Sequence, residues 1–228
     1  MTVFQFVFKR FFRKKSNSIF LLVLPIGAIF LPVGEWPPIP LGFHYYGIII
    51  MFIASRLAAI IMEDRANKTL LRLSVAPITH FQYLLQNLLA YTGILTAVNL
   101  VFVMLGVMVH GESVPSPSLL FIIYTVYSIT ALGFSLAWYA IFRNKEAAFS
   151  ILGGIIILMA MLGGVLWPVE IMPESLQRAV MLLPTYWVAE ATLLLSYGAP
   201  SEELVVPLVV MFLFCIAFLL LGSRRRLM

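Results

Sequence analysis

Few side chains in this sequence have the types and spacing that catalysis or metal binding requires. The three histidines, His44, His80 and His110, stand far apart, and the single cysteine, Cys215, has no second cysteine to pair with. The sequence contains neither a G-x-x-x-x-G-K-[ST] phosphate-binding loop nor an H-E-x-x-H zinc motif. We therefore expect that the chain is not an enzyme and holds no metal or cofactor of its own.

The polar side chains inside long apolar segments form the second candidate group, and they are chiefly Arg56, Gln86, Asn87 and Asn99. A charged side chain at the centre of a membrane helix costs about 2.5–3.5 kcal/mol on insertion scales. Arg56 lies six residues from the end of its segment, so two interpretations stay open: it extends toward the interface, or it contacts another helix or a polar cavity. No acid lies in the middle of a segment, which argues against proton or sodium coupling.

Composition and charge placement indicate a multi-pass protein of the cell membrane. Apolar residues make up 62% of the chain and charged residues 11%, against about 45–50% and 25% in soluble domains. Thirteen of the 15 lysines and arginines fall in alternate gaps between apolar segments, and seven of the ten acids fall in the other gaps. Short cytoplasmic loops are rich in Lys and Arg, so both termini are predicted to be cytoplasmic. The net charge of +5 comes from these flanks and does not indicate nucleic-acid binding.

The pattern predicts an all-α membrane protein, one domain over residues 1–228, with six transmembrane helices. The predicted spans are residues 18–33, 43–62, 81–109, 119–142, 148–166 and 204–221. The first span is short for a bilayer core that needs about 20 residues, and Pro25 and Pro32 interrupt it. It also resembles a signal peptide, but residues 34–38 are a poor cleavage site, which favours an uncleaved span.

Residues 1–15 are predicted to form an amphipathic helix on the membrane surface. Apolar side chains recur there at helical spacing, while Lys9 and Arg13 lie on the opposite face and Arg10 lies at the boundary. Such a helix would place its phenyl rings in the acyl region and its cations at the headgroups. The alternative is a simple basic flank for the first span.

Residues 167–198 are predicted to form a re-entrant helical hairpin before the last span. Two apolar stretches there are each too short to cross alone, and Pro168, Pro173 and Pro184 break the chain around them. A single kinked span would make seven crossings and place the basic C-terminus outside, against the charge rule. Two half-helices that enter from outside fit better.

Two motifs together resemble the ABC-2 type transporter permeases. Residues 62–78, MEDRANKTLLRLSVAPI, are similar to the E-x-x-x-x-T-x-x-x-L…P-[IV] cytoplasmic signature, with Lys68 where the family commonly has glycine. Residues 162–177, LGGVLWPVEIMPESLQ, followed by Leu183 and Pro184, resemble the element between the fifth and sixth spans. The order, spacing and membrane placement of the motifs extend the resemblance over nearly the whole chain.

The resemblance implies a permease subunit of an ATP-driven exporter. Two copies, or one copy and a paralogous permease, would form the pore, and two copies of a separate ABC ATPase would bind ATP and Mg²⁺. Residues 63–78 would form the cytoplasmic coupling segment, although composition alone favours a solvated loop. The ATPase-coupling residues would be Glu63, Asp64, Arg65, Lys68, Thr69, Leu71, Arg72 and Pro77. The external gate would comprise Gly164, Pro168, Pro173, Pro184 and Glu190.

The substrate class follows only from the expected lining of the pore. A pore between two such subunits would be lined mostly by Phe, Leu, Ile and Met, which suits a hydrophobic or amphiphilic cargo such as a drug, an antibiotic or a peptide. Glu190 is a candidate contact for a cationic or amphiphilic substrate. The alternatives are an ion or haem exporter of the same family, a secondary carrier or channel without an ATPase, and a membrane subunit that only anchors or regulates its ATPase.

Overall fold

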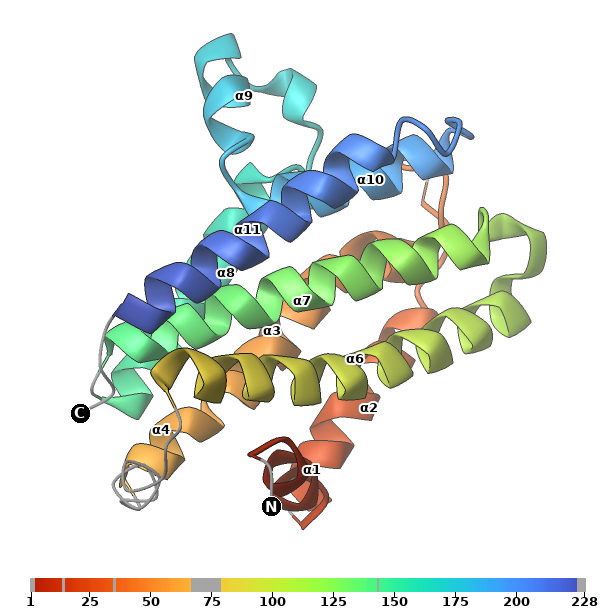
Figure 1. Cartoon of the computed structure of the whole chain (residues 1–228). Coiled ribbons are helices and arrows are strands. Elements are labelled where there is room, and N and C mark those ends of the chain that lie inside the picture. The colour runs from red at the N-terminus through yellow and green to blue at the C-terminus, as the bar shows by residue number, and fades with distance from the viewer. Residues whose placement is uncertain (1–2, 14, 35, 67–78, 143, 225–228) are drawn as a thin grey trace.

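The computed structural model describes residues 3–13, 15–34, 36–66, 79–142 and 144–224, and the elements within these ranges are helices joined by turns (Figure 1). The N-terminal half contains α1 (Val3–Arg13), α2 (Lys15–Ile29), α3 (Leu41–Ala58), α4 (Ile60–Ala66) and α6 (His80–His110). The C-terminal half contains α7 (Pro117–Ile141), α8 (Lys145–Leu162), α9 (Glu174–Val180), α10 (Pro184–Ser196) and α11 (Val205–Arg224). The short 3₁₀ turns η1 (Gly111–Ser113) and η2 (Val169–Ile171) lie between these helices.

Helix α7 lies at the centre of the bundle and packs against α3, α6 and α11 (Figure 1). Its tyrosines Tyr124 and Tyr127 are fully buried. Gly133 lets α11 approach closely, since a Cβ there would lie 3.3 Å from the Cys215 sulfur. Thr130 Oγ1 also donates a hydrogen bond to the Met211 carbonyl of α11, at 2.7 Å. The core is therefore held by small residues and by polar bonds as well as by apolar packing.

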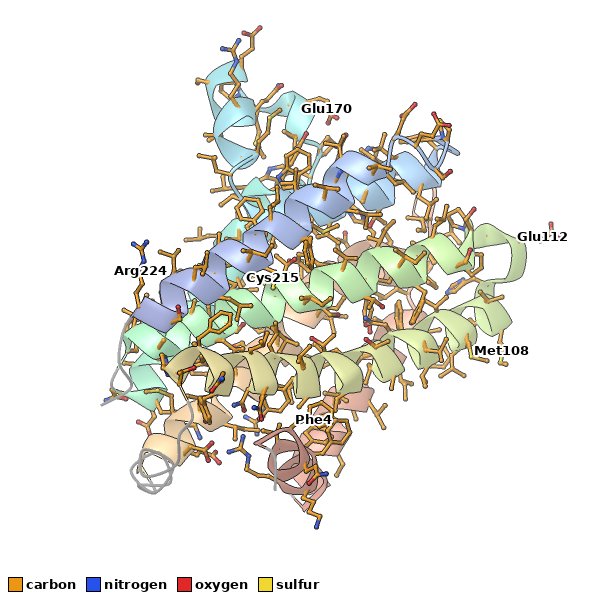
Figure 2. All side chains as sticks on the ribbon, in the orientation of Figure 1. Phe4, Met108, Glu112, Glu170, Cys215 and Arg224 are labelled. Carbon is orange, nitrogen blue, oxygen red and sulfur yellow. The ribbon has the colours of Figure 1, made fainter. Side chains whose placement is uncertain are left out.

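Five helical segments in the described part of the chain are long and apolar enough to cross a membrane: Leu41–Asp64, His80–Ser113, Pro117–Ile141, Lys145–Leu162 and Val205–Arg224. The protein is thus an all-α, multi-pass membrane protein. These segments match the predicted second to sixth spans, with a helix break at Ala59 between α3 and α4. Figure 2 shows Glu112, at the η1 turn, and Arg224, on α11, at opposite ends of the bundle.

The predicted first span is the shorter helix α2. Its 15 residues correspond to about 22 Å of rise, below the roughly 30 Å of a bilayer core. The end of α2 nevertheless reaches the η1 end of the bundle, because His110 Nε2 donates to the Ile29 carbonyl at 2.6 Å. Near this end the backbones of α2 and α3 touch: a Cβ on Gly42 would lie 2.0 Å from the Ala28 carbonyl oxygen.

The helix predicted for residues 1–15 is α1, but its apolar face does not point wholly into lipid. Val7 and Phe11 are buried, at 1% and 2% exposure, and α1 packs against α6. Phe4 is 40% exposed, and its backbone N–H donates to Gln86 Oε1 of α6 at 3.3 Å. The expectation that the phenyl rings lie in the acyl region is therefore wrong for Phe11, because α6 offers a protein surface for burial.

The segment predicted as a hairpin contains η2, α9 and α10. Helices α9 and α10 meet at 99° across a short break, and α9 stands away from the bundle while α10 runs beside it (Figure 1). Pro184 occupies the first turn of α10, where its missing N–H costs no helical hydrogen bond. The bend therefore lies at the proline where the sequence predicts it.

Candidate coupling site and hairpin pocket

A buried polar network joins α1, α4 and α6 at the end of the bundle that leads into residues 67–78. Arg10 of α1 donates through Nη1 to Asp64 Oδ2 and through Nη2 to the Tyr91 hydroxyl, the latter at 2.8 Å. The Tyr83 hydroxyl donates to the same Asp64 oxygen at 2.9 Å. Asp64 lies on α4, and both tyrosines lie on α6. One carboxylate therefore binds a cation from α1 and a hydroxyl from α6.

The ion pair of this network is largely shielded from solvent. The side chains of Arg10 and Asp64 are 10% and 9% exposed. Burial lowers the pKa of Arg10, but the neighbouring Tyr91 and Asp64 raise it by more, so the pKa lies above the usual value for arginine. The guanidinium therefore stays charged, and removing the Asp64 carboxylate would take an opposite charge away from a largely buried cation.

A second, more open ion pair connects α4 to the start of α8. Lys145 Nζ donates to Glu63 Oε1 at 2.7 Å, with side-chain exposures of 47% and 30%. Exposed pairs of this kind contribute about 0–1 kcal/mol. A cavity of about 260 Å³ beside the pair is lined by Arg56 and Glu146 among others. The exposed Arg56 side chain thus lies at this cavity, and both of its sequence interpretations stay open.

The rest of the predicted coupling segment lies outside the described residues. Those residues are Lys68, Thr69, Leu71, Arg72 and Pro77. Of the three remaining candidates, Asp64 belongs to the buried network and Glu63 to the exposed pair, whereas only the backbone of Arg65 is described, in α4. The assignment of these residues to ATPase coupling stays a prediction.

The predicted gate residues have distinct structural positions. Gly164 adopts a positive φ of 81°, and a Cβ there would lie 2.7 Å from a Val169 methyl group. Both the backbone conformation and the lack of space therefore disfavour any side chain at this position. Pro168 and Pro173 immediately precede η2 and α9. The proline-rich sequence thus sets the helix boundaries of the hairpin.

A bond to α8 fixes the start of α10. Thr185, buried at the start of α10, donates to the Met159 carbonyl of α8 at 2.6 Å. A Cβ on the neighbouring Gly163 would lie 2.3 Å from the Thr185 hydroxyl oxygen. The Gly163-Gly164 pair therefore allows the hairpin to return against α8.

The hairpin encloses a pocket of about 170 Å³ against the first turn of α3. Glu190 of α10 is half-buried in this pocket, and Glu170 of η2, which Figure 2 labels on the hairpin, lines it as well. Trp36 and His44 close it from the α2–α3 turn and α3, with their ring centroids 5.5 Å apart. Of the predicted gate residues, only Gly164 and Glu190 line the pocket.

The predicted intramembrane amides play unequal structural roles. Asn99 accepts from the Tyr46 hydroxyl at 2.9 Å and donates to Ser128 Oγ at 3.0 Å, and so joins α3, α6 and α7. Asn87 donates to the Tyr83 carbonyl of its own helix at 2.8 Å, and its Oδ1 has no hydrogen-bond partner among the described residues. Asn99 therefore connects three helices, as buried amides do in membranes. Among the described residues, the hydrogen bond of Asn87 stays within its own helix.

Two of the three histidines contact the backbone of another helix. His80 and His110 each contact a backbone carbonyl, of Gly222 and Ile29, which is the role expected of isolated histidines near membrane boundaries. Within the described ranges, no three His, Cys, Asp or Glu side chains are grouped as ligands for a metal ion.

Sequence reasoning missed three members of the buried network: Arg10, Tyr83 and Tyr91. The available signal was the position of Arg10 at the boundary between the two faces of its helix, where a long side chain can turn inward. Nothing in the spacing of Tyr83 and Tyr91 identifies them, since tyrosine is common throughout these apolar segments. The network depends on contacts between segments up to 81 residues apart.

Comparison with known families agrees with this architecture. The model of the ABC-2 family transporter proteins matches residues 41–224, from the start of α3 to the end of α11. The chain therefore belongs to the ABC-2 family, the membrane permease components of ABC transporters. A search of the curated proteins found no match.

Proposed function

We propose that the chain is the permease subunit of an ATP-driven exporter, powered by a separate ABC ATPase that binds ATP and Mg²⁺. The observation that best supports coupling is the buried network of Arg10, Asp64, Tyr83 and Tyr91. It ties the segment that enters residues 67–78 to α1 and to α6, the 31-residue helix. A displacement of residues 67–78 by the ATPase would then move α4, α1 and α6 together.

The proposed topology places both termini and residues 67–78 in the cytoplasm, with α2 as a short first crossing. The positions of α1 and η1 support this assignment, because α2 starts beside α1 and ends beside His110 at the opposite end of α6. A short apolar helix can cross when neighbouring helices cover it and the bilayer thins locally. The α9–α10 hairpin then enters the membrane from outside as the external gate.

We further propose that two permease copies, or one copy and a paralogue, form the pore. Helix α8 presents large apolar side chains to the outside of the bundle, among them Phe149, Ile157 and Leu158. On the same helix, a Cβ added at Gly154 would meet no atom of the described residues within 4 Å. A glycine that packs against no described side chain suits close contact with a second helix.

The proposed cargo is a hydrophobic or amphiphilic small molecule or peptide of the drug or antibiotic type, so that the transporter would confer multidrug or antibiotic resistance. The exposed apolar side chains of α8 support this class, since they would line a pore between two copies. An ion or haem exporter is the alternative within the family.

The experiment is a charge reversal in the proposed coupling segment. The double variant K68E/R72E should lose ATPase binding and amphiphile-stimulated ATP hydrolysis, because both cations would face the partner. The matched control is K9E, which reverses an exposed lysine of α1 outside residues 63–78. Normal ATPase assembly and transport in K68E/R72E would refute the coupling assignment, and ATPase activity that responds to no member of an amphiphile panel would refute the cargo class.

A further inference from the structure

The hairpin pocket combines acids, aromatic rings and a buried histidine from three parts of the chain. Glu170 and Glu190 lie close enough for their charges to interact unfavourably, and the lining residues, all within the described chain, include no lysine or arginine. The aromatic rings of Trp36 and Tyr186 form other parts of the wall. Carboxylates and electron-rich rings together favour a cation.

His44 provides the independent observation that this pocket is built for a ligand. Its side chain is 5% exposed and lines the pocket, and neither ring nitrogen meets a hydrogen-bond partner among the described residues. The backbone of Val165 is near the ring but outside hydrogen-bonding geometry. Buried polar atoms without partners are rare and costly, so a ligand with an N–H group would satisfy the acceptor nitrogen of a neutral imidazole.

We propose that the pocket binds a protonated primary or secondary amine. The Glu190 carboxylate and a ring nitrogen of His44 accept its N–H groups, and Trp36 and Tyr186 face its positive charge. The volume of about 170 Å³ is below the roughly 300–1,000 Å³ of pockets that enclose whole drug-sized ligands, so the pocket takes an ammonium headgroup and leaves the apolar remainder outside. As a statement about cargo, this inference rests on the proposed exporter function and narrows the cargo to amphiphilic amines.

The test uses the purified full chain in maltoside detergent without an ATPase, so that its failure is distinguishable from failure of the exporter proposal. Calorimetric titration with phenethylamine should give saturable binding, at least tenfold tighter than with the N,N,N-trimethyl analogue, which lacks N–H donors. E190Q should weaken amine binding at least tenfold. H44F should reduce the preference for the amine over its trimethyl analogue, because only the Glu190 acceptor then remains.

Two further variants separate loss of the site from loss of the fold. E170Q changes an exposed side chain of the pocket rim and should weaken binding several-fold without affecting thermal stability. E203Q changes an exposed acid outside the pocket and should bind like the unmodified chain. Absence of saturable amine binding, or equal affinities in E190Q and E203Q, would overturn the proposal.

The amine can come from a soluble cargo or from a lipid headgroup. Titrations in phosphatidylglycerol nanodiscs with and without phosphatidylethanolamine distinguish these sources. Weaker phenethylamine binding in the presence of phosphatidylethanolamine would support the site and assign it to the headgroup. Unchanged binding would support the site and assign it to a soluble amine.

Discussion

Replacing Asp64 with asparagine should destabilise the protein strongly and specifically. The substitution keeps the size of the side chain and an oxygen for the Tyr83 hydroxyl, but it removes the carboxylate charge to which Arg10 donates in the buried network. Breaking a buried ion pair from one side typically costs about 3–5 kcal/mol. The 10% exposure of the Arg10 side chain places this pair in that class.

The assay is thermal unfolding of the purified protein in detergent. For a chain of about this length, 1 kcal/mol corresponds to about 2–4 °C, so D64N should lower the unfolding midpoint by about 6 °C or more. The control is E63Q, which breaks the exposed pair with Lys145 and should shift the midpoint by about 4 °C at most. The double variant R10Q/D64N should be more stable than the sum of the single variants predicts, because no buried charge is left unpaired. A D64N midpoint equal to that of E63Q would refute the reasoning.

Two other substitutions test the helix contacts. G42A should lower the unfolding midpoint by about 2 °C or more, since its Cβ would lie 2.0 Å from the Ala28 carbonyl oxygen and overpacking costs about 1–3 kcal/mol. G27A, whose Cβ would meet no described atom within 4 Å, should not lower the midpoint. Equal effects of the two substitutions would contradict the close contact of α2 and α3. T185V should lower the free energy of unfolding by about 1 kcal/mol, and the midpoint by about 2–4 °C, by removing the hydrogen bond to the Met159 carbonyl. An unchanged midpoint together with unchanged protease sensitivity of the hairpin would argue that this bond does not hold α10 to α8.

The helical framework could be predicted from the sequence because a bilayer permits few structures. Long apolar runs must satisfy their backbone hydrogen bonds internally, so residues 81–109 and 119–142 correspond to α6 and α7 within three residues at each end. The sequence overestimates the length of the first helix. The run continues to Val33, but α2 ends at Ile29, because the chain turns back at Pro32, which accepts the Leu41 N–H.

The candidate sites were only partly predictable. The external gate predicted from the sequence includes Glu190 and Gly164, which do share a pocket, but not His44, which comes from a helix more than 100 residues earlier. The sequence predicts Asp64 as an ATPase-coupling residue but does not predict its burial beside Arg10. Such contacts depend on how helices pack, and hydrophobic periodicity carries no information about which polar side chains will meet.

The most direct test of the exporter proposal is co-purification with an ABC ATPase. The chain would be expressed with each cassette ATPase encoded near its own gene, and the detergent-solubilised complex would be examined for subunit stoichiometry and ATP hydrolysis. We predict a stable complex of two permease chains and two ATPases that hydrolyses ATP and that does not form with K68E/R72E. A chain that purifies alone beside every such ATPase would contradict the proposal and favour a carrier or channel.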